Sequence, residues 1–139
     1  DEVLNLILNE SECIIHSKGE IFFKEQDHPD GMYVLEFGIV DVFKTWKDEE
    51  YHLSQLSSGD CFGEMALVDM NFRSASIRAI EDCQAIKIPT RVFTEIASFD
   101  LEQFALIQMN MGREICRRLR LADSALFEQM VKTKEHSVV

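Results

Sequence analysis

Residues 59–79 read GDCFGEMALVDMNFRSASIRA, and the rest of the chain is organised around them. Gly63 opens a run, residues 63–68, with the composition of one short helix, and Arg73 begins the alternation of a strand. A glycine at a helix start lets backbone N–H groups approach a ligand closely, and these unpaired donors favour an anion. Arg73 adds a planar set of donors suited to gripping a phosphate in two places.

Glu64 is the unexpected member of this group, because a carboxylate repels phosphate. It is consistent with the same ligand if it accepts hydrogen bonds from hydroxyl groups, such as a ribose 2′-OH. One helix end, one arginine and one glutamate therefore predict a pocket for a small ribose phosphate. The alternative is that Glu64 and Arg73 form a surface ion pair, which would contribute little.

The same stretch resembles the phosphate-binding cassette of cyclic nucleotide-binding domains, of the type found in the cAMP receptor protein and the protein kinase A regulatory subunit. The family pattern F-G-E-[LM]-A-L is met by residues 62–67, and the later R-[ST/A]-A by residues 73–75. About eight residue types at fixed offsets make a specific signal. The resemblance implies a mainly β fold, a β jelly roll with an N-terminal helix and a long C-terminal helix.

The resemblance also implies a ligand, a 3′,5′-cyclic nucleotide, and a role for each matched residue. It assigns the ribose to Glu64 and, through the last helix, the base to Arg120 and Asp123. Because Asp123 can accept hydrogen bonds from adenine or guanine, cAMP is only favoured over cGMP. The residues implied for the cyclic phosphate are Gly63, Met65, Ala66, Arg73 and Ser74.

Length, charge and composition limit the other functions. A chain of 139 residues with 46% hydrophobic and 28% charged residues suits a single globular domain. Its net charge of −11 argues against nucleic acid as a partner. No apolar run reaches the length of a membrane span and the start lacks a signal-peptide pattern, so we expect a cytoplasmic protein without membrane contact.

Cysteine and histidine patterns predict neither disulfides nor a metal. The cysteines are far apart and form no C-x-x-C pair, which favours reduced thiols that are buried or half-buried. The histidines are equally scattered, so we expect no metal and no cofactor besides the nucleotide. The residues in question are Cys13, Cys61, Cys83, Cys116, His16, His28, His52 and His136.

The remaining pattern predicts one domain, residues 1–139, in two parts. Residues 1–99 hold a short N-terminal helix, many short strands separated by turn signals, and a hinge helix that Thr90 can cap. Residues 100–131 form a long lid or dimer helix, which Asp100 and Gln103 open in the manner of a capping box. Residues 132–139 form a polar tail.

The apolar stripe of the long helix has two interpretations. It can pack against the rest of the domain, or its distal half can form a homodimer, because a helix of about 45 Å exceeds what the domain covers.

The sequence thus predicts a non-catalytic sensor that signals by moving its last helix, without DNA contact by this chain. The main alternative is a ligand-free jelly roll that serves as a docking or dimerisation module. A jelly-roll metalloenzyme is disfavoured, because no strand carries paired histidines.

Overall fold

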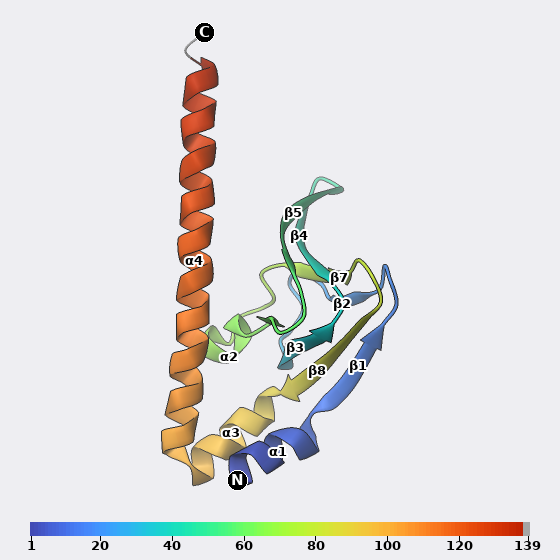
Figure 1. Ribbon diagram of the computed structural model, residues 1–139, viewed down its shortest axis with the longest axis vertical. Helices are drawn as coiled ribbons and strands as arrows, with labels where there is room; N and C mark the ends of the chain where they lie inside the picture. Colours follow the sequence, from blue (N-terminus) through green and yellow to red (C-terminus); the bar gives the residue numbers. More distant parts are fainter. Residues whose placement is uncertain (138–139) are drawn as a thin grey trace. The chain divides into compact units, whose positions relative to one another are not determined.

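Two antiparallel four-stranded sheets form the body of the protein in the computed structural model (Figure 1). The structure describes residues 1–137, except for the side chains of Ala66, Leu67 and Ser137. The strands are β1 (Glu12–His16), β2 (Ile21–Phe23), β3 (Gly31–Phe37), β4 (Val40–Trp46), β5 (Glu49–Leu56), β6 (Cys61–Phe62), β7 (Ser76–Ala79) and β8 (Cys83–Pro89). The helices are α1 (Glu2–Glu10), α2 (Met65–Asp69), α3 (Thr90–Phe99) and α4 (Leu101–Ser137).

The order of the strands is that of a jelly roll. One sheet runs β1-β8-β3-β6 and the other β2-β7-β4-β5, so strands distant in sequence lie side by side. The predicted jelly roll, with an N-terminal helix and a long C-terminal helix, is confirmed.

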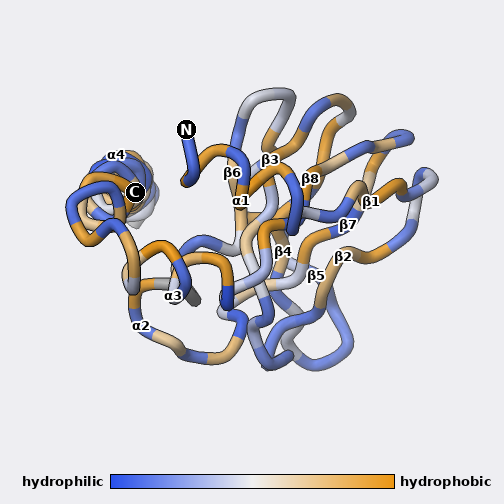
Figure 2. Tube along the Cα trace, turned by 90° about the horizontal axis from the view of Figure 1, so that it is seen from below, coloured by the Kyte–Doolittle hydropathy of each residue, from blue (hydrophilic) through white to orange (hydrophobic). Residues whose placement is uncertain are grey.

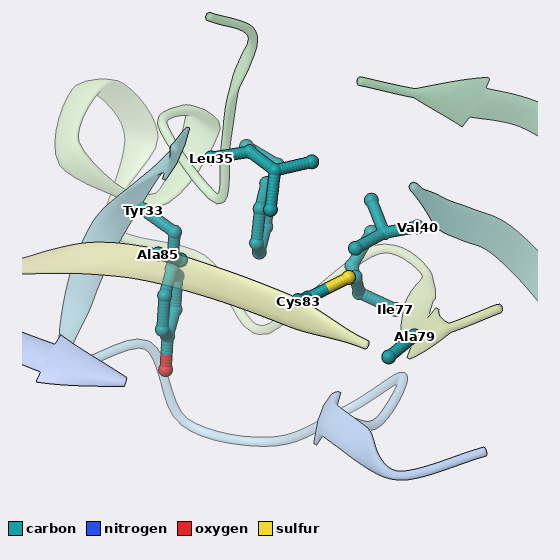
Figure 3. Close-up of a cluster of buried hydrophobic side chains, with 8 residues drawn as sticks. Tyr33, Leu35, Val40, Ile77, Ala79, Cys83 and Ala85 are labelled. Carbon is teal, nitrogen blue, oxygen red and sulfur yellow. The ribbon is translucent and has the colours of Figure 1, made fainter. Parts of the chain in front are cut away.

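The core lies between the two sheets, where alternate side chains of their strands meet (Figure 3). Leu35, Val40 and Ala79 are each at most 1% exposed. Period-two alternation in the sequence places these residues on one face of each strand. The buried cluster consists of Tyr33, Leu35, Val40, Phe62, Ile77, Ala79, Cys83 and Ala85.

Gly38 connects β3 to β4 and carries the chain from one sheet to the other. Its φ is +99°, a conformation that residues with a Cβ atom rarely adopt. A Cβ atom here would lie 2.6 Å from both the carbonyl oxygen of Asp82 and Sγ of Cys83. The change of sheet at this point therefore requires glycine.

The helix ends differ in part from expectation. Pro89, rather than Thr90, occupies the N-cap position of α3, and no side chain caps that helix. Thr90 is instead its first residue and donates its N–H to the carbonyl of Asp30 at 3.1 Å. At the start of α4, Oδ1 of Asp100 accepts from the N–H of Gln103 at 3.1 Å, which confirms that half of the predicted capping box. The N–H of Asp100 donates to the carbonyl of Ile96 at 2.8 Å, in place of the reciprocal bond to the Gln103 side chain.

A second compact unit begins at Ala105 and consists of the remainder of α4. The helix continues to Ser137 instead of ending at residue 131. Lys132, Lys134 and Glu135 are good helix formers, and no glycine or proline interrupts them. Viewed along its axis, α4 shows both hydrophobic and hydrophilic colouring (Figure 2). No helix among residues 1–137 is long and apolar enough to cross a membrane.

The prediction for the cysteines is correct for two of the four. Cys83 is buried and Cys61 is partly buried, but Cys13 and Cys116 are exposed. Cys13 lies on β1, an edge strand, where a small residue is not forced inward. Cys116 lies on an exposed part of α4.

Candidate functional site

The cassette is anchored to the core by Phe62. This side chain is 2% exposed, and its ring stacks on that of Tyr33 with centroids 5.0 Å apart. The next residue, Gly63, has a φ of +78°, and a Cβ atom there would lie 2.6 Å from Nη1 of Arg73. Glycine at position 63 therefore lets the arginine lie directly against the cassette backbone.

Arg73 is held in the interior from several sides. Its Nη1 donates to the carbonyl of Gly63 at 3.0 Å, and its Nη2 donates to the carbonyl of Gly31 at 2.8 Å. The guanidinium lies over the ring of Phe23, with its carbon 4.0 Å from the ring centroid. These protein contacts by themselves fix the plane and direction of the side chain.

The main chain of Arg73 is fixed as well. Its N–H donates to the carbonyl of Asp27 at 2.9 Å, and its carbonyl accepts from the N–H of Gln26 at 2.8 Å. The loop between β2 and β3 thus forms a second support for the arginine.

A buried positive charge with an unused donor is the chief electrostatic feature of the site. The side chain of Arg73 is 3% exposed, and burial lowers its pKa. Asp30 forms an ion pair with this guanidinium, with its Oδ1 3.5 Å from Nη2, but Asp30 is itself exposed and also paired with Lys87. The Nε of Arg73 is buried and has no hydrogen-bond acceptor among the described residues. The arrangement can accept an anion with an oxygen at that nitrogen.

Glu64 is buried too, at 2% exposed. The alternative of a surface ion pair between Glu64 and Arg73 is therefore wrong, because both side chains lie in the interior. A buried carboxylate needs hydrogen-bond donors around it. This environment is compatible with the hydroxyl groups of a ligand among those donors.

The other predicted site residues are distributed over both units. Met65 begins α2 and is 49% exposed, and Ser74 is exposed next to the arginine. Ala66 belongs to the residues whose side chains lie outside the description. Arg120 and Asp123 lie on α4, in the second unit, and are exposed. The structure thus brings Gly63 together with Arg73 and leaves the role of Arg120 and Asp123 a prediction.

Four residues that support the arginine or its neighbour are not apparent from the sequence. Phe23, Asp30 and Gly31 contact the guanidinium, and Lys44 contacts the carbonyl of Ser74. Residues 27–31 read DHPDG, a composition typical of a turn, which indicates a loop here but not the direction of its carbonyl groups.

Two surface hollows of about 470 and 390 Å³ are lined by neither Glu64 nor Arg73. Residues of β4 and β5 contribute to both of them. Among the described residues no group of three His, Cys, Asp or Glu side chains could hold a metal ion.

The chain is similar in sequence to known cyclic nucleotide-binding proteins. A model of the cyclic nucleotide-binding domain matches residues 15–99. The cyclic AMP receptor protein of Thermus thermophilus is 31% identical over 126 residues, which cover 90% of this chain and 56% of that protein. The chain therefore spans little more than half of that relative.

Solved structures agree with this family match. The catabolite activator protein of Thermus thermophilus superposes with a TM-score of 0.74 at 29% identity, covering 90% of this chain and 57% of that one. The EAL enzyme Bd1971 in its cAMP-bound form has a TM-score of 0.58 at 32% identity, covering 80% and 30% of the two chains. Its cGMP-bound form also gives 0.58, at 34% identity, covering 73% and 27%.

Proposed function

The chain belongs to the cyclic nucleotide-binding domain family, and from this premise we propose that it senses a 3′,5′-cyclic nucleotide at residues 63–74. The observation that carries the proposal is Arg73, a buried guanidinium whose Nε has no acceptor among the described residues. A phosphate oxygen supplies such an acceptor together with a compensating negative charge. The other guanidinium nitrogens already bond to Gly31 and Gly63, so the ligand meets a preformed group.

The ribose belongs to Glu64 in this proposal. The 2′-OH of a cyclic nucleotide is free to donate, because the cyclic phosphate uses the 3′ and 5′ oxygens. A buried carboxylate gains a charge-assisted hydrogen bond from this hydroxyl group. Gly63, Met65, Ala66 and Ser74 complete the set of residues around the phosphate.

The base is assigned to Arg120 and Asp123 on α4. Asp123 can accept from the amine of adenine or from the N–H groups of guanine. We favour cAMP because relatives of this type are named for it. A related enzyme has been solved with cAMP and with cGMP, so both nucleotides are tested.

The output proposed for the domain is movement of α4 over the bound base. We also propose that exposed apolar residues on the distal part of α4 form a homodimer. Support comes from the length of the helix and from Leu119 and Leu126, which are 59% and 61% exposed. The chain itself is proposed to be non-catalytic, cytoplasmic and without DNA contact, although the related Bd1971 is an enzyme.

Titration calorimetry of the metal-free protein with cAMP and with cGMP tests the function. The proposal predicts saturable heat with one or both nucleotides, and a tighter complex with cAMP. Absence of heat with both at two temperatures would favour the alternative, a ligand-free docking or dimerisation module. Two temperatures are needed because a binding enthalpy can pass through zero at one of them.

A further inference from the structure

Lys44 lies at the point where β4 passes the cassette. Val40 of β4 belongs to the buried cluster and Val42 packs against it, and the two-residue period of a strand places Lys44 on the same face. The extra residue of the β4–β5 bulge is Leu53 on β5, so it does not disturb this alternation. Lys44 is therefore the exposed continuation of this face, and its ammonium lies beside the residues that follow Arg73.

The ammonium of Lys44 holds the residue next to the phosphate arginine. Its Nζ donates to the carbonyl of Ser74 at 2.9 Å. The same Nζ lies 3.3 Å from Oε2 of Glu25. A lysine ammonium has three donors, so both contacts can form together.

Glu25 connects this lysine to the rest of the sheet. Its N–H donates to Oγ of Ser76 at 2.8 Å, and its Oε1 accepts from the N–H of Thr45 at 3.4 Å. Glu25 is only partly exposed, whereas Lys44 is 48% exposed. Lys44 and Glu25 therefore hold the chain at both Ser74 and Ser76, immediately after Arg73.

We propose that Lys44 is a positioning residue for nucleotide binding, which acts by fixing the Ser74 backbone beside the phosphate. This inference rests on the proposed function, because it presumes that the phosphate binds at Arg73 and Ser74. Position 44 lies outside the cassette motif, and neither the motif nor the turn signals point to it. Without the lysine, the exposed Ser74 loses its hydrogen bond from β4. The backbone beside the proposed phosphate position then becomes less ordered.

The experiment compares Lys44→Met with Lys47→Met, which removes the same charge from the neighbouring hairpin tip. Lys47 lies over the Trp46 ring at 5.7 Å and has no described contact with Ser74. Lys44→Arg keeps a cationic donor, and Glu25→Gln keeps the side-chain shape while removing the ion pair. The affinity of each variant for cAMP and cGMP is measured by calorimetry, and melting temperatures are measured without ligand.

Lys44→Met is expected to lower the affinity for cAMP and for cGMP equally, by about threefold to tenfold, because the substitution acts at the phosphate and not at the base. Lys47→Met should bind like the wild type, and Lys44→Arg should recover most of the loss. Equal affinities of Lys44→Met and Lys47→Met would overturn the inference while leaving the proposed function intact. The inference would also be overturned if Lys44→Met lost affinity only because its melting temperature fell, and if Lys44→Arg did not recover that affinity. Wild-type protein that binds neither nucleotide would overturn both proposals.

Discussion

Arg73 carries a positive charge into the interior, where its guanidinium donates to the backbone carbonyl groups of Gly31 and Gly63. Carbonyl dipoles offset part of the desolvation of a guanidinium, and Asp30 at 3.5 Å compensates its charge only in part, because that carboxylate is exposed and also paired with Lys87. An anion at Nε would supply that compensation. The arginine is thus both a structural bridge between Gly31 and Gly63 and the group on which ligand affinity depends in the proposed function.

Replacement of Arg73 should therefore abolish measurable nucleotide binding. Arg73→Ala is expected to cost about 3–5 kcal/mol, or roughly a hundredfold to a few thousandfold in affinity, because one partner of the charge pair with the phosphate is removed. Arg73→Lys should also bind poorly, since one ammonium cannot reach Gly31, Gly63 and the ligand in the guanidinium geometry. Titration calorimetry gives the affinity, and circular dichroism checks that each variant is folded. Near-normal affinity in either folded variant would exclude Arg73 from the site.

Glu64 offers a test with a modified ligand. If it accepts from the ribose 2′-OH, 2′-deoxy-cAMP should bind more weakly than cAMP by about 1.5–3 kcal/mol. Glu64→Gln should narrow this difference, because a neutral amide forms a weaker bond with the hydroxyl group. Glu81→Gln changes an exposed glutamate and serves as the control. Equal losses for the two ligands in Glu64→Gln would mean that Glu64 shapes the cassette without touching the sugar.

The sequence predicts which residues of the site would contact a ligand, but not the distant residues that hold them in place. Gly63, Glu64 and Arg73 stand at recognisable spacings in one stretch, so the sequence alone is enough to single them out. Phe23 and Lys44 act from strands far away in the sequence. Their contacts depend on strand order, which short-range patterns do not contain.

The paired strands β3 and β8 form the element next to the cassette strand β6. Tyr33 lies opposite Lys87 in this pair, and Nζ of Lys87 is 5.9 Å from the centroid of the tyrosine ring. Burial raises the pKa of Tyr33 above its ordinary value of 10.0. The folded state therefore holds the phenolic proton more tightly than the unfolded state. This contribution to stability is complete below pH 10 and is lost as pH rises through the folded pKa.

We accordingly expect the free energy of unfolding to fall as the pH is raised above 10. Tyr33→Phe should show a smaller fall over the same range, because phenylalanine has no proton to lose. Tyr51→Phe is the matched control, since Tyr51 is 50% exposed. Urea unfolding at several pH values measures the effect. A pH dependence of Tyr33→Phe as steep as that of the wild type would contradict this assignment.

The distal part of α4 is the element on which oligomeric state should depend. Leu119 and Leu126 are seven residues apart and share one face of the helix, at about 100° per residue. Leu121 lies on the opposite face, although its 58% exposure matches the 59% of Leu119. Substitutions at these three leucines can therefore distinguish a dimer that uses one face of α4 from association that depends only on exposed apolar area.

If α4 forms a homodimer through the first face, Leu119→Asn with Leu126→Asn should convert a dimer to a monomer. Leu121→Asn should leave the dimer unchanged. Sedimentation equilibrium of the three proteins measures this directly. A monomeric wild type at high micromolar concentration, or equal effects of both faces, would argue against this dimer.

Elements are predicted from the sequence more reliably than their limits. The spacing of apolar residues predicts α4 but not its continuation to Ser137, because the polar composition of residues 132–137 is also typical of a tail. Lys and Glu side chains stabilise a helix that needs no buried face at its end. The strand β6 is not predicted either, because its two residues are too few to show alternation.

The whole molecule would act as a sensor only if binding in the first unit alters the second. The first unit, which ends at Phe104, holds Arg73 and Glu64, whereas Arg120 and Asp123 belong to the second. A ligand can shift α4 only by the difference in its affinity for the two arrangements of the helix. Base contacts from α4 would supply that difference, because the proposed phosphate and ribose contacts involve residues of the first unit alone.

Hydrogen exchange across residues 100–130 tests this coupling. Saturating nucleotide should slow exchange in α4 of the wild type, because closure over the base would reduce local opening of the helix. Arg73→Ala should show no such change, since it does not retain the ligand. Asp123→Ala leaves the proposed phosphate and ribose residues unchanged, so this variant should bind nucleotide more weakly and show less slowing of exchange in α4 at full saturation. If wild-type α4 exchanges at the same rate with and without nucleotide, the helix is not a lid and the domain binds without switching.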